Sequence, residues 1–171
     1  MRAICISMVI GGLVHPGIVS AQGIASFGPR DKVAIEQLFD DYGKAFAKED
    51  YATLREYIQA PFVRLGPSNT FNETSSGDWV VLRTIDDALS FYRAAREALK
   101  AQGVDVRSEW RQTRVTALSA ERALVNRTYR RYRKGGSPFD AASVYVVTKS
   151  SGSWKICGLM NQDLRQFGRV Y

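Results

Sequence analysis

The chain has 171 residues, of which 24 are lysine or arginine and 17 are aspartate or glutamate, so its formal net charge is +7. This length suits one domain with a sizeable core. The chain holds one histidine and two cysteines. No CxxC, HxH or HExxH spacing occurs, so we expect neither a transition-metal site nor a cofactor.

The first 21 residues are typical of a secretory signal peptide. Arg2 provides the positive charge at the start, an apolar stretch follows, and Val19-Ser20-Ala21 provides a cleavage site of small residues. We therefore expect residues 1–21 to be removed, residues 22–29 to form a flexible leader, and residues 30–171 to form a single domain that is periplasmic or secreted. The apolar stretch is too short to span a bilayer, and we expect no membrane span after cleavage.

Signal cleavage also limits the chemistry of the mature chain. His15 and Cys5 both lie in the removed segment, so the mature chain keeps no histidine and only Cys157. A single cysteine cannot form a disulfide within the chain, and Cys157 lies in an apolar stretch, so we interpret it as a small buried hydrophobe. The basic charge suits an acidic small-molecule partner, and export argues against nucleic acid as a partner.

Apolar residues at three- and four-residue spacing predict three helices in the first part of the chain. The first begins near residue 30, the second spans residues 51–58 with Asp50 as its cap, and the third begins at Thr84. Thr84 and Asp87 match a capping box. The inner face of the first helix is formed by Ile35, Leu38, Phe39, Tyr42 and Phe46.

After Gly103, which ends the third helix, the apolar spacing changes to two, which predicts strands. We expect strands over residues 106–115, 123–133, 139–149 and 154–161, preceded by two short strands over 62–65 and 79–82 that flank a polar loop over 67–78. Helices followed by a meander of strands indicate an α+β fold.

Three stretches carry a resemblance to a known family: residues 38–46 with the short helix after them, residues 88–99, and the closing strands at 145–149 and 152–156. Their order resembles the nuclear transport factor 2-like superfamily, and within it the SnoaL-like and ketosteroid-isomerase-like proteins. The resemblance implies N-terminal helices packed in a curved antiparallel sheet, a cystatin-like cone with a pocket inside it. It also implies a homodimer formed through the outer face of the sheet.

The chain departs from the catalytic patterns that this resemblance implies. SnoaL-like cyclases and dehydratases use a histidine with an aspartate, and the mature chain has no histidine. Ketosteroid-isomerase-like members place an aspartate on the first strand, and residues 62–72 contain no acid. An enzyme would therefore depend on other residues, and the weak candidates are Tyr42, Asp40 and Glu109. The resemblance to ketosteroid-isomerase-like sites implies that Tyr42 could polarise a substrate carbonyl. Asp41 and Asp140 are further candidate acids for proton transfer.

Arginines and tyrosines alternate in the segment from Arg127 to Lys134. On a strand, Tyr129 and Arg131 share one face with Arg127, and Arg130 lies on the other face. Both faces therefore carry arginine, and a strand of the cone must turn at least one of them inward. A buried guanidinium needs a partner, either a protein carboxylate or a bound anion. The alternatives are a structural salt bridge and long side chains that reach water near an open strand end.

The sequence leaves three functions open. The leading hypothesis is an exported pocket protein for a small anionic or aromatic molecule, with ligand-binding candidates Trp110, Tyr129, Arg130, Arg131 and Tyr145. The second is an isomerase, dehydratase or hydrolase that works without a cofactor through Asp or Glu and Tyr. The third is a homodimeric interaction module whose cone is filled with side chains. Packing in the core is the competing role for Trp110, and a surface ion pair with a neighbouring arginine is the competing role for Glu109.

Overall fold

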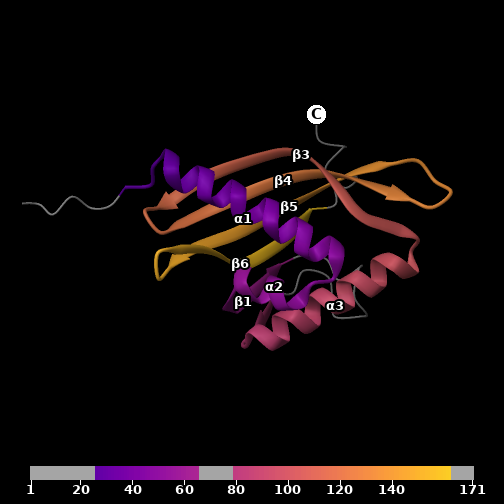
Figure 1. Ribbon diagram of the computed structural model, residues 1–171, viewed down its shortest axis with the longest axis horizontal. Helices are drawn as coiled ribbons and strands as arrows, with labels where there is room; N and C mark the ends of the chain where they lie inside the picture. Colours follow the sequence, from indigo (N-terminus) through magenta and orange to yellow (C-terminus); the bar gives the residue numbers. More distant parts are fainter. Residues whose placement is uncertain (1–25, 66–78, 163–171) are drawn as a thin grey trace, which may run out of the picture.

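The computed structural model describes residues 26–65 and 79–162, without the side chains of residues 106–108, 110, 161 and 162. The expected signal peptide, the first residues of the leader and the polar loop at 67–78 lie outside these residues. In chain order the elements are α1 (Pro29–Lys48), α2 (Tyr51–Tyr57), β1 (Ile58–Leu65), β2 (Val80–Leu82), α3 (Ile85–Ala101), β3 (Val104–Ser119), β4 (Arg122–Arg133), β5 (Phe139–Ser150) and β6 (Ser153–Gln162). Helices precede the long strands, which confirms the α+β class (Figure 1).

Helices α2 and α3 begin at the capping residues that the sequence predicts. Asp50 caps α2 by accepting a hydrogen bond from the Thr53 N–H at 3.0 Å. Thr84 and Asp87 form the expected capping box of α3: Thr84 Oγ1 accepts from the Asp87 N–H at 3.1 Å and Asp87 Oδ2 accepts from the Thr84 N–H at 3.0 Å. These side chains satisfy backbone N–H groups that have no partner within the helix.

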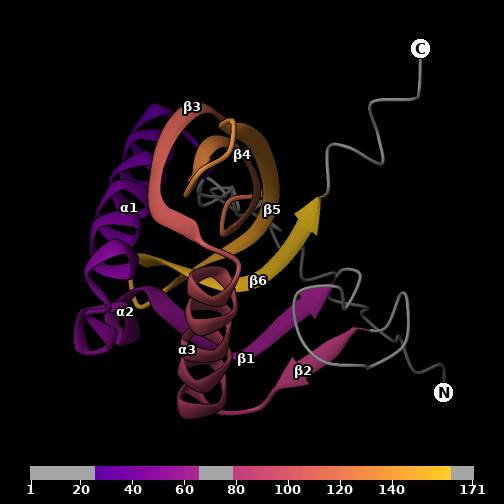
Figure 2. The ribbon, with the colours of Figure 1, turned by 90° about the vertical axis from the view of Figure 1, so that its right-hand side faces the viewer.

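The six strands form one sheet in the order β2-β1-β6-β5-β4-β3. All neighbouring pairs are antiparallel except β1 with β6, which run parallel. The sheet is curved as expected: Figure 2 shows it curling strongly through β3, β4 and β5, with β1 and β2 extending away at the other end. The first strand begins earlier than residue 62, because Ile58 already pairs with Ile156 of β6. The expected second helix therefore ends at Tyr57, one residue before its predicted end.

The third strand is longer than the sequence suggests. It spans 16 residues because its pairing with β4 runs from Val104 opposite Arg133 to Ser119 opposite Arg122. A register shift between Trp110 and Gln112 interrupts this pairing. Regular alternation along a strand over residues 106–115 would put Trp110 and Gln112 on one face. That expectation is wrong at this point, because Trp110 lies opposite Tyr129 whereas Gln112 lies opposite Thr128.

Helix α1 lies along the buried face of the sheet and runs in the direction opposite to β5. Near its start Asp31 bonds to Lys149, in its middle Phe39 contacts Tyr145, and near its end Phe46 packs with the group around Leu99 that also contacts Phe139. Within the expected leader, Phe27 packs edge to face on Trp154, with ring centroids 5.9 Å apart. In the described part of the chain no helix has both the length and the apolar character to cross a membrane.

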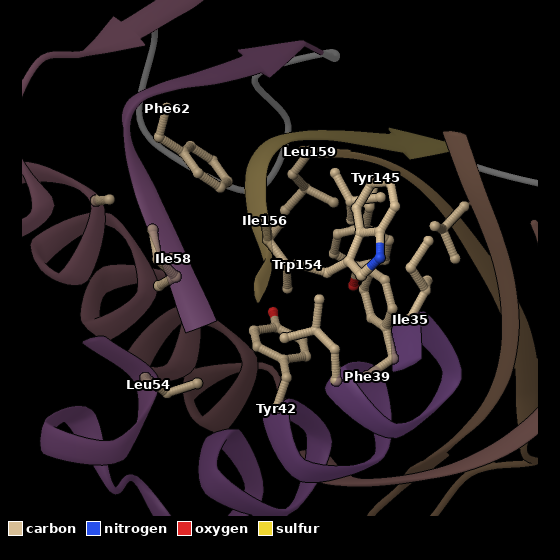
Figure 3. Close-up of a cluster of buried hydrophobic side chains, with 14 of the residues drawn as sticks. Ile35, Phe39, Tyr42, Leu54, Ile58, Phe62, Tyr145, Trp154, Ile156 and Leu159 are labelled. Carbon is tan, nitrogen blue, oxygen red and sulfur yellow. The ribbon is translucent and has the colours of Figure 1, made fainter. Parts of the chain in front are cut away.

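The main core lies between the helices and this face. Figure 3 shows Phe39 and Tyr42 extending from α1 toward Tyr145, Trp154 and Ile156 of the sheet. Residues of this core that are at most 2% exposed are Ile35, Phe39, Leu54, Ile58, Phe62, Ala88, Tyr92, Ala123, Val125, Val147 and Ile156. Removing this much apolar surface from water is the main driving force for the fold.

Candidate functional site

The concave face of β4 carries two arginines, which makes it the candidate site. Arg127 is only 3% exposed, and this confirms that at least one arginine of the strand points inward. Its Nη2 donates to Asp40 Oδ1 of α1 at 3.4 Å, and its guanidinium carbon lies 5.1 Å from the centroid of the Phe39 ring. Burial lowers the pKa of the Arg127 guanidinium, and Tyr145 and Asp40 act in the opposite direction. The Asp40 side chain is 57% exposed, so water weakens its attraction to the guanidinium.

Two and four residues further along β4, Tyr129 and Arg131 lie on the same face. Arg131 Nη2 donates to the Tyr129 hydroxyl at 3.2 Å, and the Arg131 guanidinium carbon stands 4.9 Å from the centroid of the Tyr129 ring. The Tyr129 hydroxyl also lies 3.1 Å from Ser143 Oγ on β5. Arg131 Nε is buried and has no hydrogen-bond partner within the described part of the chain. The guanidinium is therefore held in a fixed orientation, with donor capacity left over.

Deeper in the cone, tyrosines fill the space between the helices and β5. Tyr42 of α1 contacts Tyr92 of α3 and Tyr145 of β5, with ring centroids 5.9 Å and 6.0 Å apart. All three are at most 5% exposed. Burial raises the pKa of each phenol well above its ordinary value, so all three are neutral at physiological pH. This part of the cone is a packed core, and Tyr42 and Tyr145 belong to it.

Arg64 is a further buried arginine, on a strand for which the arginine and tyrosine pattern of residues 127–134 gives no signal. It lies on the inner side of β1, two residues after the fully buried Phe62, and it is 7% exposed. Its guanidinium carbon lies 5.2 Å from the centroid of the Phe91 ring of α3. Burial lowers the pKa of Arg64. The two-residue spacing from the strongly apolar Phe62 is the signal that places Arg64 on the inner face.

Arg130 lies on the opposite, outer face of β4. It is bound there by two hydrogen bonds to Asp140, from Nε at 2.8 Å and from Nη2 at 3.1 Å. Glu109 is also at this surface, where it accepts a hydrogen bond from the Tyr132 hydroxyl at 2.8 Å and pairs with Arg111 at 3.2 Å. The surface ion pair considered for Glu109 is therefore present.

The structure does not bring the candidates for proton transfer together. Tyr42 lies in the core, Asp40 lies on the exposed side of α1, and Glu109 lies on the outer face of the sheet. Asp41 bonds to Gln37 and Lys44 at the surface, at 2.8 Å and 3.1 Å.

Trp110 and Cys157 both lie on strands of the sheet. Trp110 lies opposite Tyr129 in the sheet, and its side chain is outside the described part of the structure. Cys157 is half-buried, less enclosed than expected, and its thiol donates to the Val146 carbonyl at 3.5 Å. Burial raises the pKa of this thiol, which makes it a poor nucleophile.

Comparison with known proteins gives a consistent family and fold. The family model for NTF2-like protein DUF6841 matches residues 30–164. No curated protein gives a significant match. An NTF2-like protein of unknown function from Pseudomonas putida KT2440 is similar with a TM-score of 0.60 at 12% identity, over 80% of this chain and 88% of that one. A ketosteroid isomerase-like protein from Erwinia carotovora atroseptica is similar with a TM-score of 0.56 at 20% identity, over 78% of this chain and 96% of that one.

A third solved structure is described as a domain of unknown function with a cystatin-like fold, from Nostoc punctiforme. Its TM-score is 0.59 at 20% identity, over 82% of this chain and 84% of that one. At these identities the likeness concerns the fold alone, because unrelated functions share such folds.

Proposed function

We propose that this chain, which belongs to the NTF2-like family DUF6841, is an exported protein that binds a small anionic molecule on the concave face of its sheet. The observation that carries the proposal is the arrangement of Arg131. Its guanidinium is stacked on Tyr129 and bonded to the same hydroxyl, while its buried Nε has no protein acceptor within the described residues. A carboxylate or phosphate oxygen would supply that acceptor through a charge-assisted hydrogen bond.

The surroundings of Arg131 favour an anion with an aromatic part. Arg127 adds a second cation on the same face of β4, and its guanidinium is shielded from water. Desolvated cations attract an anion more strongly than exposed ones, because the effective dielectric constant is lower. The rings of Tyr129 and Phe39 stand beside the two guanidinium groups, and rings of this kind pack well against a flat ligand. Export is supported by the signal-like residues 1–21 alone.

Native mass spectrometry of the full-length gene product, purified gently after expression with its first 21 residues, is the first test. We expect a mature chain that begins near residue 22 and a co-purifying mass that is lost when the protein is denatured. The same spectrum reports whether the expected homodimer forms. A chain that keeps residues 1–21 would contradict export. Anion binding is tested separately, by calorimetry.

Isothermal titration calorimetry with sodium benzoate tests the anion, with benzamide as the uncharged ligand of the same shape. We expect saturable binding of benzoate and none of benzamide. The variant Arg131→Gln should weaken benzoate binding by about tenfold or more, since a hydrogen bond to a charged group contributes about 1.5–3 kcal/mol. Arg130→Gln is the matched control, because it removes the neighbouring arginine from the outer face of the same strand. Equal weakening in both variants, or equal binding of benzoate and benzamide, would contradict the proposal.

A further inference from the structure

A hollow that is open to solvent lies on the outer face of the sheet, opposite the concave site. It has a volume of about 340 Å³ and is lined by Gln112 and Arg114 of β3 and by Asn126 and Thr128 of β4. On β4 these two residues alternate with the buried Arg127 and Tyr129, so their side chains point to the outer face. The β3 residues are their direct partners, Arg114 opposite Asn126 and Gln112 opposite Thr128.

Two features of the sheet lie beside the hollow. On the β3 side, the register shift between Trp110 and Gln112 changes the direction in which the strand presents its side chains. On the β5 side, the residues opposite Asn126 and Thr128 are Val144 and Ala142. These short apolar side chains offer no hydrogen-bond partner to the polar groups of the hollow.

The polar groups that line the hollow have no partners within the described part of the chain. None of the four side chains makes a hydrogen bond or an ion pair there. The neighbouring polar side chains on the same face, Arg130 and Glu109, do have partners. Arg130 is bound to Asp140, and Glu109 is bound to Tyr132 and Arg111. Gln112, Arg114 and Asn126 are exposed to solvent, so the charge of Arg114 is available at the hollow, whereas Arg130 and Glu109 are already bound to other side chains.

We propose that this hollow binds a small hydroxylated anion, a carboxylate or phosphate that carries neighbouring hydroxyl groups. The planar guanidinium of Arg114 matches the two oxygens of a carboxylate or phosphate. Gln112 and Asn126 each offer an amide that both donates and accepts, and Thr128 offers a hydroxyl, which together suit the hydroxyl groups of such a ligand. The volume is at the lower end of the range for small-molecule sites, which favours a compact ligand.

The two sites are separated by the sheet and differ in chemistry. The concave site stacks guanidinium groups on aromatic rings, whereas the outer hollow is lined by amides, a hydroxyl and one arginine. A variant in one site should therefore leave the other unchanged, and the two proposals can fail independently. Arg114 and Arg131 provide that pair of variants.

Two-dimensional NMR of 15N-labelled mature protein, titrated with sodium gluconate at constant ionic strength, tests the proposal. We expect saturable shifts of the side-chain amides of Gln112 and Asn126 and of the backbone amides beside them. Inorganic phosphate should compete for the same signals, and sodium chloride should not. The variant Arg114→Gln should weaken gluconate binding at least about tenfold. Arg122→Gln, which removes another exposed arginine of this sheet outside the hollow, and Arg131→Gln should leave it within about twofold.

Several outcomes would overturn the proposal. Shifts that do not saturate, or equal weakening by Arg114→Gln and Arg122→Gln, would show a general attraction of anions to a basic protein. The resemblance implies a homodimer through this outer face, whereas the proposed site requires Gln112 and Asn126 to stay open to solvent. A homodimer that covers them and prevents the gluconate shifts would assign this face to the second copy of the chain instead. A loss of gluconate binding in Arg131→Gln but not in Arg114→Gln would move the bound anion to the concave face.

Discussion

Asp31 near the start of α1 accepts a hydrogen bond from the ammonium group of Lys149, 118 residues later at the end of β5, at 2.8 Å. The same Oδ1 accepts from Trp154 Nε1 at 3.2 Å, and Oδ2 accepts from the Gly28 N–H at 3.0 Å. One carboxylate thus fastens the beginning of the first helix to the hairpin between β5 and β6.

Protonation of Asp31 should weaken the fold in acid. The hydrogen bonds from Lys149 and from the Gly28 N–H lower the pKa of Asp31 from 3.8 to about 2. Because the pKa is lower in the folded state, the stabilisation is complete above pH 4 and is lost as the pH falls toward 2. Asp31→Asn should lower the Tm at pH 7 by several degrees and flatten the Tm profile below pH 4. Glu36→Gln, which removes an exposed pair with Lys32, is the control, and an equal effect there would contradict this role.

Truncation of Phe39 should be among the most damaging changes on α1. Phe39 is fully buried, and its ring contacts Tyr42 and Tyr145. Phe39→Ala should lower the free energy of unfolding by about 3–5 kcal/mol, because it removes buried apolar area and leaves a cavity. Val33→Ala changes an exposed residue of the same helix and should cost less than about 0.5 kcal/mol. Guanidinium denaturation of the two variants measures the difference, and similar losses would be inconsistent with α1 facing the sheet through Phe39.

The Tyr129 and Ser143 hydroxyls should be energetically coupled. They lie 3.1 Å apart between β4 and β5, and Ser143 is 1% exposed. A double-mutant cycle of Tyr129→Phe and Ser143→Ala, measured by urea denaturation, should give a coupling free energy of about 0.5–1.5 kcal/mol. Strictly additive losses would mean that the two hydroxyls do not share a hydrogen bond in solution.

Gly158 should not tolerate a side chain. A Cβ at this position would lie 3.2 Å from two carbons of Val146 and 3.2 Å from the Val63 carbonyl oxygen, which belongs to the neighbouring strand β1. Gly158→Ala should destabilise the protein by about 1–3 kcal/mol, measured by thermal unfolding. Adding Val146→Ala should restore only part of the loss, because the carbonyl cannot move away. Gly136→Ala is the control, because only the flexible Arg133 side chain is near that position. A full rescue of Gly158→Ala by Val146→Ala would contradict this argument, because it would show that the Val63 backbone of β1 can move away.

The sequence predicted those parts of the fold that depend on neighbouring residues. The capping pair of Thr84 and Asp87 and the inner face of α1 around Phe39 follow from local spacing, and the structure confirms them. The direction of β1 does not follow from its own residues, because pairing with the last strand decides it. The register shift after Trp110 likewise depends on the partner strand rather than on a turn residue in the sequence.

The candidate sites were predictable to a smaller extent. Alternation showed that Arg127 and Arg130 lie on opposite faces, but it could not decide which face the helices cover. That assignment needed the contact of Phe39 with the Arg127 guanidinium. The outer hollow is lined by residues of two strands, β3 and β4, and a single sequence does not show which residues of two strands lie opposite one another.

The parallel pair of β1 and β6 also sets the order in which this protein can be assembled. Among the described residues, β2 is bonded to β1 alone, and β1 joins the other strands only through β6, the last strand described. The first strand can therefore join the rest of the sheet only after β6 has been synthesised, and until then it can pair with β2 alone. The pairing of β1 with β6 is accordingly a late step in the assembly of the sheet, because its two strands are far apart in the chain.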